Sequence, residues 1–526
     1  MYLAGRRRAI VLPYSTGMLA RLRFYWLVAA CGGVLMALEI LSSRILAPYF
    51  GNSVYVWGSI ISVFLAALSV GYLWGGRLAD RQPSLAALAR LVVLGAACEE
   101  ALLLAGQRLA AWLADLTGGS PAGTLLAAAV LFGPASVLLA TVSPYAVRLA
   151  ARDLGQLGNT AGRLYALSTA GSLAGTLACT FALIPFFDLR QILAVLTVAT
   201  ALTALLALGG SWRGELPSAL LGCLICAAAL FGARLPGHPG SDLIYERTTP
   251  YQTLLVRERH GVRYLESDRV TQAAVRLADG EPELPYVRAV PAVLLLGPPI
   301  RSMLALGLGG GSVGSYLQRR LPGLAVDYVD IDPAVPEVAR RYLRFRPGPL
   351  TTVTVADGRR FLSRAGRRWD FIYCDTYIGL SVPFHLTTVE FMDEVKRHLT
   401  EGGVFGLNLA AGLSDPFSLA MYRTVRERFA AVYPFRVWGA ANILVLARDG
   451  PGSLPPARLV ARGRELDRQG WRFDPPLATI ASGRMAVDIP TGTVPLLSDQ
   501  FAPVDRLIRL GAAAGRPTWR LPAGGR

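Results

Sequence analysis

Three aspartates in the second half of the chain each stand at or just after the end of a short apolar run typical of a β-strand. They are Asp330, Asp357 and Asp375. In sheets built from alternating strands and helices, ligands bind beyond the carboxyl ends of the strands, so acids at three successive strand ends predict a ligand site. A single aspartate after a strand is more often a helix cap, and Asp357, which precedes GRRFL, also fits that interpretation.

A glycine-rich turn lies between the first two of these strands. It belongs to the stretch MLALGLGGGSVGSYLQRRLPGLAVDYVDID, from Met303 to Asp332, and contains Gly307, Gly309 and Gly311. Glycine has no Cβ, so the backbone can take positive φ and approach a ligand closely, and the following helix offers free N–H groups. Asp330, about 20 residues further on, is placed to accept hydrogen bonds from ribose hydroxyls. The alternative is a tight connection between strand and helix without a ligand.

The residues after the glycines exclude a triphosphate-binding P-loop. That motif needs Gly-Lys followed by Ser or Thr, whereas Gly311 is followed by Ser312 and Val313. Lys396 is the single lysine of the chain, and it is distant in sequence from the glycine turn. A lysine that binds phosphate or forms a Schiff base near the turn is therefore excluded too. The sequence therefore favours an adenosine-type cofactor.

The elements that position these residues alternate between strand and helix. The predicted strands after the glycine turn are Thr351 to Ala356, Trp369 to Cys374, Gly403 to Leu409 and Asn442 to Ala447, and the predicted helices are Thr387 to Leu399 and Phe417 to Ala431. This alternation predicts a doubly wound α/β sheet of Rossmann-like type. Short β-like runs over 243–277 predict a small hairpin-rich sheet before it.

The first half of the chain has the composition of a membrane protein. The 526 residues are 53% hydrophobic, and the mean hydropathy of +0.41 is high for a soluble protein. Apolar runs long enough to cross a bilayer recur near 24–41, 57–76, 86–105, 122–142, 164–186, 191–209 and 216–233. We therefore expect three parts: a transmembrane bundle of about seven helices over 1–235, a β-hairpin domain over 236–290 and the α/β domain over 291–526.

Charge predicts the orientation of the bundle. Arginines at 6–8, 21 and 23 precede the first run, and further arginines follow the second and fourth runs, which makes the N-terminus cytoplasmic. Seven crossings then place the second half outside the cell, whereas an adenosine cofactor requires a cytoplasmic domain. These two inferences conflict, and we attribute the conflict to the helix count.

The formal net charge of +17 fits a membrane protein that faces anionic lipid. No aromatic-interleaved basic stripe or zinc-finger spacing accompanies it, so nucleic-acid binding is not indicated. The six cysteines and four histidines are scattered, and we expect neither a disulfide framework nor a metal site. Four ionisable residues lie within the apolar runs, where they mark either a substrate path or a structural lock: Glu39, Arg44, Glu99 and Glu100.

Taken together, several segments resemble the spermidine synthase (polyamine aminopropyltransferase) family, specifically its membrane-fused members. The segments of the second half are Pro250-Tyr251-Gln252, LESDRVTQ ending at Gln272, GLGGGS, YVDIDP, VADGRRFL, YCDTY, PFHLTTVEF and SDQFAPVDRL. The first half resembles the same group in LEILSSRILAPYFGNS and GYLWGGRLADR. The resemblance covers most of the chain.

The resemblance implies a role for each matching residue. Gln252 and Gln272 are expected to contact the nucleoside, Asp330 the ribose and Asp357 the adenine. Asp375 is expected to take the proton of the amine, with Tyr286 on the aminopropyl or amine side. The remaining expected cofactor contacts are Gly307, Gly309, Gly311, Ser312 and Gly358.

Two positions depart from the family pattern. Ser312 stands where the family's glycine turn continues with an aspartate, and Ile378 stands at the place of a second acid after the fourth strand. We therefore expect aminopropyl transfer from decarboxylated S-adenosylmethionine to an amine such as putrescine, with no tightly bound cofactor. Two alternatives stay open: methyl transfer from S-adenosylmethionine, and a polyamine transporter or sensor whose nucleoside-binding domain is not catalytic. The expected partners are a small amine, the lipid bilayer of the cell membrane and a second copy of the soluble domain, which we expect to be cytoplasmic.

Overall fold

The computed structural model describes residues 18–51, 53–151, 156–208, 215–233, 242–297, 300–379, 381–450, 454–485 and 489–513. The chain forms two compact units, Met1–His238 and Pro239–Arg526, which we take one at a time. The arginines at 6–8, which contributed to the predicted orientation, lie outside the described residues, as do 234–241, where the first predicted part passes into the second.

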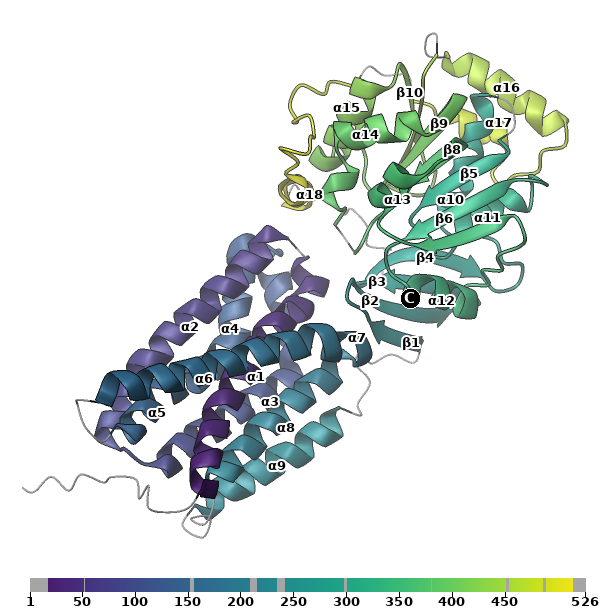
Figure 1. The fold of residues 1–526 in the computed structure, drawn as a ribbon. Coiled ribbons are helices and arrows are strands. Elements are labelled where there is room, and N and C mark those ends of the chain that lie inside the picture. The colour runs from purple at the N-terminus through teal and green to yellow at the C-terminus, as the bar shows by residue number, and fades with distance from the viewer. Residues whose placement is uncertain are drawn as a thin grey trace, which may run out of the picture. The chain divides into compact units, whose positions relative to one another are not determined.

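The first unit is helical (Figure 1). Its helices are α1 (Met18–Phe50), α2 (Val54–Arg81), α3 (Leu85–Thr117), α4 (Pro121–Ala140), α5 (Val142–Ala150), α6 (Leu157–Ala178), the short α7 (Ile184–Phe186), α8 (Leu189–Leu208) and α9 (Leu216–Gly232). Local sequence sets the ends of α3 and α4. Ser84 and Ser120 cap their first turns, Pro121 occupies the first position of α4, and Gly118 closes α3 in the left-handed conformation.

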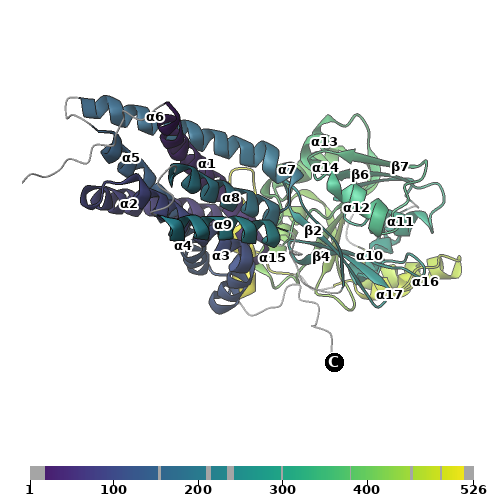
Figure 2. The same cartoon turned by 90° about the horizontal axis from the view of Figure 1, so that it is seen from below.

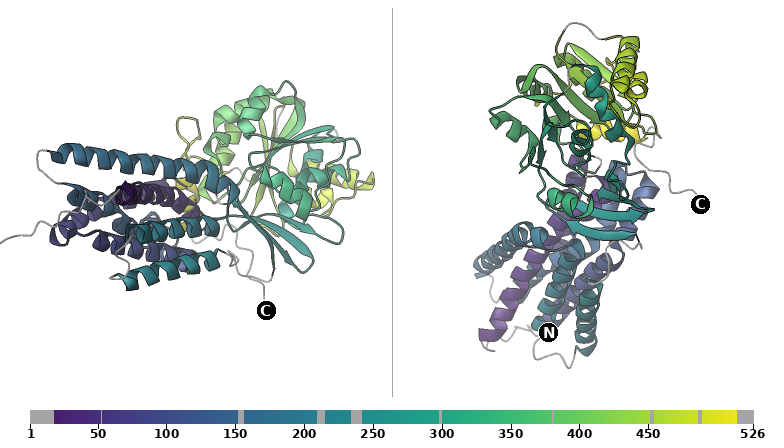
Figure 3. Two further views of the ribbon diagram at one scale, coloured as in Figure 1. Left: turned by 60° about the horizontal axis from the view of Figure 1, so that its bottom comes forward. Right: turned by 90° about the vertical axis from the view of Figure 1, so that its right-hand side faces the viewer.

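Glycines allow the helices of this unit to pack closely, and α1 and α6 run side by side in the views of Figures 1 and 3. A Cβ on Gly175 would lie 2.0 Å from the carbonyl oxygen of Gly33 on α1. A Cβ on Gly71 of α2 would lie 2.6 Å from the carbonyl oxygen of Val137 on α4. The small-residue spacings Gly71/Gly75 and Gly171/Gly175 thus let these helices approach closely.

Within the described part of the chain, five helices are long and apolar enough to cross a membrane. They span Arg21–Phe50, Val54–Arg81, Pro121–Ala150, Leu157–Phe186 and Leu189–Leu208. The other two predicted crossings fall on α3, which carries Glu99 and Glu100, and on α9, which has 17 residues. The predicted count of seven crossings is therefore not confirmed.

The second unit begins with a four-stranded antiparallel sheet, as predicted from its alternating runs. The strands β1 (Leu243–Thr248), β2 (Thr253–Arg259), β3 (Val262–Ser267) and β4 (Val270–Arg276) follow one another in the order of the sequence. Two tight turns join the last three strands, at His260-Gly261 and at Asp268-Arg269, and all four turn residues have positive φ.

A seven-stranded sheet follows in the order β10-β11-β9-β8-β5-β6-β7 (Figures 1 and 2). Its strands are β5 (Ser302–Leu306), β6 (Ala325–Asp330), β7 (Thr351–Val355), β8 (Trp369–Cys374), β9 (Leu399–Leu409), β10 (Ala431–Arg436) and β11 (Ile443–Arg448). Strands β5 to β9 are parallel, which confirms the Rossmann-like α/β prediction. The antiparallel edge strand β10 was not predicted, because the helix predicted over 417–431 runs to its first residue.

Helices cover both faces of this sheet (Figure 1). One face packs against α10 (Pro285–Ala289), α11 (Ser312–Gln318), α12 (Ala334–Tyr342), α16 (Pro456–Arg468) and α17 (Leu477–Ser482). The other packs against α13 (Gly358–Arg364), α14 (Val389–Arg397), α15 (Pro416–Arg428) and α18 (Val504–Ala513). Both apolar faces are thereby buried, and the carboxyl ends of β5, β6, β7 and β8 are brought to one edge.

Candidate active site

A pocket with about 1060 Å³ of empty space, its mouth included, opens at the carboxyl ends of the central strands. The predicted site residues that line it are Gln252, Gln272, Tyr286, Gly307, Gly309, Ser312, Asp330, Asp357, Gly358 and Asp375. Folding thus brings together predicted site residues that lie up to 123 positions apart in the sequence, from Gln252 to Asp375.

The glycine turn after β5 forms the floor of this pocket. Gly307 has φ of 89°, and a Cβ at this position would lie 2.0 Å from the carbonyl oxygen of Asp375. Gly311 differs, because it is not among the lining residues. Gly311 has φ of 67°. A Cβ on Gly311 would lie 2.3 Å from the ring of Phe345, so only glycine leaves room for this ring. The structure therefore places Gly311 in packing behind the turn.

Asp330 ends β6 and holds the glycine turn in place. Its Oδ2 accepts a hydrogen bond from the backbone N–H of Leu308 at 2.9 Å, and its Oδ1 accepts one from Asp332 at 3.0 Å. Burial raises the pKa of Asp330 to about 6, although these hydrogen bonds oppose the effect. The carboxylate lines the pocket and is ionised at neutral pH.

Asp357 both caps a helix and lies in the pocket lining. Its Oδ1 caps α13 by accepting from the backbone N–H of Arg360 at 2.9 Å, and the residue also lines the pocket. Its Oδ2 lies 2.8 Å from Nε2 of His385, another lining residue. Burial acts to raise the pKa of Asp357, but the hydrogen bonds from Arg360 and His385 outweigh it and hold the pKa below its usual value.

Asp375 follows the last residue of β8, and its carboxylate has two polar neighbours, Asn408 and Tyr286. Asn408, near the end of β9, donates from Nδ2 to Oδ1 of Asp375 at 3.0 Å. The hydroxyl of Tyr286 lies between this carboxylate and the carbonyl oxygen of Gln272, which it approaches to 3.1 Å. Burial raises the pKa of Asp375 to about 6, and the contacts with Asn408 and Tyr286 limit the rise.

Three tyrosines surround the Asp375 carboxylate: Tyr286, Tyr373 and Tyr377. Burial raises the pKa of each hydroxyl above its ordinary value, so all three are neutral donors at pH 7. The Tyr373 hydroxyl is buried and has no hydrogen-bond partner among the described residues. The Oγ atom of Ser312, at the start of α11, is in the same condition. Buried polar groups are normally paired, so both atoms are open to a bound molecule.

The two predicted glutamines are held by the protein itself. Gln252 donates from Nε2 to Oδ2 of Asp332 at 3.1 Å, and Gln272 donates from Nε2 to the carbonyl oxygen of Gly379 at 3.3 Å. These contacts fix the amide groups while their oxygens remain available. Both side chains line the pocket.

Sequence reasoning missed five residues of this site: Asp332, Tyr373, Tyr377, His385 and Asn408. Asp332 and Tyr377 lie within the segments YVDIDP and YCDTY, and His385 lies within PFHLTTVEF. Asn408 stands near the end of a strand that was predicted, so the strand-end rule that found the three aspartates could have found it.

The charge of the pocket is opposite to that of the chain. Its described lining has three aspartates and one histidine but neither arginine nor lysine, whereas the chain has 53 Lys and Arg residues against 36 Asp and Glu. Such a lining stabilises a cationic occupant and disfavours an anionic one.

Comparison with known proteins identifies the same region. Residues 302–430 match the spermine/spermidine synthase domain. A polyamine aminopropyltransferase of Vibrio vulnificus is 36% identical over 208 residues, which cover 38% of this chain and 68% of that protein. A polyamine aminopropyltransferase of Chromobacterium violaceum is 30% identical over 228 residues, covering 41% of this chain and 85% of that protein. An eEF1A lysine and N-terminal methyltransferase of Bos taurus is 32% identical over 199 residues, covering 34% of this chain and 28% of that protein. The chain is therefore a transferase that belongs to the polyamine aminopropyltransferase family.

Proposed function

We propose that the second unit transfers the aminopropyl group of decarboxylated S-adenosylmethionine to a small amine such as putrescine, giving spermidine and methylthioadenosine. The observation that supports this most directly is the pocket lining, with three aspartates and, among its described residues, neither arginine nor lysine. Both proposed substrates are cations. S-adenosylmethionine itself carries a carboxylate, which such a lining does not pair, whereas the decarboxylated form lacks it.

The nucleoside is proposed to lie along the glycine turn. Asp330 accepts hydrogen bonds from the ribose hydroxyls, and Asp357, steadied by His385, contacts the adenine. Gln252 and Gln272 contact the nucleoside from the small sheet. Gly307, Gly309 and Gly358 allow close backbone approach, and Ser312 offers its unpartnered hydroxyl.

Asp375 is the proposed proton acceptor. A free aliphatic amine has a pKa of about 10.4, so it reaches the site protonated and has to lose a proton before it attacks. Asp375, with its pKa raised to about 6, is a stronger base than an ordinary aspartate at about 3.9. The amine nitrogen forms a bond to the aminopropyl carbon, the carbon–sulfur bond breaks, and the sulfur keeps the electron pair. The amine proton goes to Asp375, and Tyr286 orients the reacting groups.

Methyl transfer from S-adenosylmethionine is the second candidate. Two observations favour it: Ser312 and Ile378 supply no charge at positions where the resemblance leads us to expect acids, and one relative is a methyltransferase. The products distinguish the two reactions, because aminopropyl transfer releases methylthioadenosine and methyl transfer releases S-adenosylhomocysteine.

The decisive experiment gives the purified full-length protein each nucleoside in turn with a mixture of amines. Methylthioadenosine as the product supports the proposal, S-adenosylhomocysteine supports the second candidate, and the absence of both overturns the two. Asp375→Asn is expected to lower turnover at least 100-fold while nucleoside binding changes less than threefold, since the carboxylate acts on the amine's proton. Asp279→Asn, on an aspartate outside the pocket lining, is the matched control.

We also propose where in the cell this activity takes place. The helical unit is membrane-embedded, and the second unit is cytoplasmic because its nucleoside is made there. A phosphatase reporter fused after residue 234 should be inactive, and an active fusion would place the second unit outside the cell. The second unit is also proposed to form a homodimer, which light scattering of the purified protein tests.

A further inference from the structure

Two carboxyl groups lie in the interior of the helical unit without partners. Glu99 and Glu100 on α3 are 1% and 7% exposed, and none of their four carboxyl oxygens has a hydrogen-bond partner among the described residues. Glu99 is the more deeply buried of the two. A carboxyl group in this condition needs an explanation, because buried polar atoms are normally paired.

Helices α1, α4 and α8 surround Glu99. Cys31 of α1 and Thr200 of α8 lie beside it. Gly95, one turn before Glu99, faces α4. A Cβ on Gly95 would lie 3.2 Å from the side chain of Leu139. Because α3 and α4 are consecutive antiparallel helices, the next turn of α3 brings Glu99 to the level of Ser136.

Two hydroxyl groups on the helices around Glu99 also lack hydrogen-bond partners among the described residues. The Oγ of Ser136 and the Oγ1 of Thr197, one turn from Thr200 on α8, are buried without a partner among the described residues. Thr200 donates its own hydroxyl proton to the carbonyl oxygen of Leu196 at 3.0 Å. In this orientation Thr200 offers Glu99 only the lone pairs of its oxygen, and Glu99 can donate to them only when its carboxyl group carries a proton.

Positive charge is far from this position on every helix that packs against α3. Helix α4 has no titratable residue, and Arg190 of α8 stands ten residues before Thr200, about 15 Å along the helix. On α1, Arg23 stands eight residues before Cys31, about 12 Å along the helix, with Glu39 eight residues after Cys31 and Arg44 13 residues after it. Helix α9 contributes the thiols Cys223 and Cys226, and α5 carries Tyr145 and Arg148, of which Arg148 is paired with Asp80 at 3.0 Å. Arg90 of α3 stands nine residues before Glu99. On α3 itself, Cys98 and Glu100 adjoin Glu99, and Arg108 comes nine residues later. Within the part of the helical unit that the structure describes, an ionised Glu99 thus has no nearby compensating cation, which favours the neutral acid.

We propose that Glu99, together with the hydroxyl groups of Ser136, Thr197 and Thr200, forms a proton-binding site inside the helical unit. The carboxyl group holds the proton, Thr200 accepts the hydrogen bond from it, and the two free hydroxyls provide a polar route to and from it. The site is independent of aminopropyl transfer in the second unit. It gives the helical unit a group whose charge changes when the proton leaves, as groups in proton-coupled membrane proteins do.

Dicyclohexylcarbodiimide tests the proposal, since this apolar reagent reacts with protonated carboxyl groups in apolar surroundings. The carboxyl proton moves to a nitrogen of the reagent, the carboxyl oxygen bonds to its central carbon, and the adduct rearranges to a stable N-acylurea. We expect the full-length protein at pH 7 to gain one reagent mass on the peptide that contains Glu99. Glu427, whose side chain is 53% exposed, serves as an internal reference and should stay unlabelled, because the reagent reacts with carboxyl groups in apolar surroundings.

Variants and a second measurement sharpen the test. Glu99→Gln should lose this label, whereas Glu39→Gln, a matched change on α1, should keep it. Infrared spectra should show a protonated carboxyl C=O band in the full-length protein that Glu99→Gln lacks. An unlabelled Glu99 peptide in the wild-type protein, or a band that persists in Glu99→Gln, overturns the proposal, and the wild-type mapping does not depend on the folding of any variant.

Discussion

Asn408 donates a hydrogen bond from Nδ2 to Oδ1 of Asp375 at 3.0 Å, and its own Oδ1 accepts one from Nδ2 of Asn442 at 2.9 Å. The amide of Asn408 is therefore fixed in orientation, with its donor side toward the carboxylate. A donor in this position stabilises the ionised form of Asp375, which burial disfavours. Strand β9 thus controls the charge of a residue that follows β8.

Asn408→Ala is expected to weaken the proposed base. Loss of a hydrogen bond to a charged group costs about 1.5–3 kcal/mol, so the acid limb of the pH–rate profile should move upward by about one to two pH units. Turnover at pH 7 should fall roughly 3- to 10-fold. Asn442→Ala is the control, since it touches Asn408 but not the carboxylate, and its effect should be smaller. An unchanged acid limb in Asn408→Ala would contradict this role.

The pH dependence of the wild-type protein follows from Asp330 and Asp375. Burial raises the pKa of both to about 6, and both are needed ionised, the first as acceptor for the ribose and the second as base. We expect kcat/KM to decrease as the pH falls through 6, by about tenfold per pH unit for one group and more steeply for two. Steady-state kinetics from pH 5 to 8 measures this, and a flat profile down to pH 5 would exclude both assignments.

Asp375→Asn should make the protein more stable while it removes activity. Because the pKa of Asp375 is higher in the folded state than in the unfolded chain, its ionised form opposes folding. The amide avoids this cost, which we estimate at roughly 1–3 kcal/mol at pH 7. The stability gain should shrink as the pH falls from about 6 to about 4, where the wild-type carboxyl becomes protonated. Thermal unfolding of both proteins at pH 5 and pH 7 is the measurement, and a less stable variant at pH 7 would refute the argument.

His385→Ala should affect nucleoside binding more than turnover. The change removes the 2.8 Å contact that fixes the Asp357 carboxylate, and one such hydrogen bond is worth about 1 kcal/mol, or roughly fivefold in affinity. Calorimetry with methylthioadenosine should show this loss, while kcat at saturation stays within about twofold. His398→Ala changes a histidine that is not among the lining residues and should leave affinity unchanged. Equal effects of the two variants would remove His385 from the site.

Gly307 and Gly323 form a matched pair for the glycine turn. Their φ angles are 89° and 88°, so alanine is strained by a similar amount at both, about 1–2 kcal/mol. A Cβ on Gly307 would lie 2.0 Å from the carbonyl oxygen of Asp375, whereas a Cβ on Gly323 has nothing within 4 Å. Gly307→Ala should therefore abolish nucleoside binding in calorimetry, and Gly323→Ala should retain it with a small loss of thermal stability.

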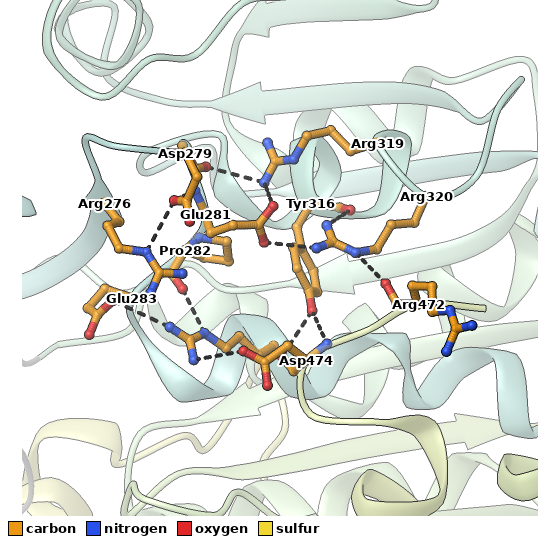
Figure 4. Close-up of polar contacts among 12 residues, drawn as sticks. Arg276, Asp279, Glu281, Pro282, Glu283, Tyr316, Arg319, Arg320, Arg472 and Asp474 are labelled. Carbon is orange, nitrogen blue, oxygen red and sulfur yellow. Dashed lines mark hydrogen bonds and ion pairs between the residues drawn. The ribbon is translucent and has the colours of Figure 1, made fainter. Parts of the chain in front are cut away.

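Ion pairs of Glu281 connect the loop after β4 with Arg319 and Arg320, which follow α11 directly (Figure 4). Glu281 lies 3.2 Å from Arg319 and 3.0 Å from Arg320, and its side chain is 21% exposed. Glu281→Gln should lower the free energy of unfolding by about 1 kcal/mol at low salt and by less at high salt. Glu465→Gln, which breaks a more exposed pair with Arg468, should cost less than about 0.5 kcal/mol. Denaturant unfolding at two salt concentrations compares them.

The sequence alone was sufficient for the α/β fold of the second unit and for most of its pocket. The glycine turn and the strand-end aspartates are local signals, because positive φ at Gly307 and an acid after a strand depend on neighbouring residues. The parallel order of strands then brings Asp330, Asp357 and Asp375 to one edge without further information.

The tertiary structure decided what depends on contacts between distant segments. Gly311 matches the same glycine pattern as Gly309, yet its place is set by Phe345, which lies 34 residues later. The pKa of Asp375 is raised by burial and held back by the hydrogen bond from Asn408 on the neighbouring strand β9, and spacing in the sequence reveals neither. In the helical unit, hydropathy gives seven apolar runs, but which of them are apolar enough over a full helix depends on where each helix begins and ends. The unpartnered state of Glu99 is likewise a property of the helices packed around it, because a sequence shows which groups are charged but not which groups can reach them.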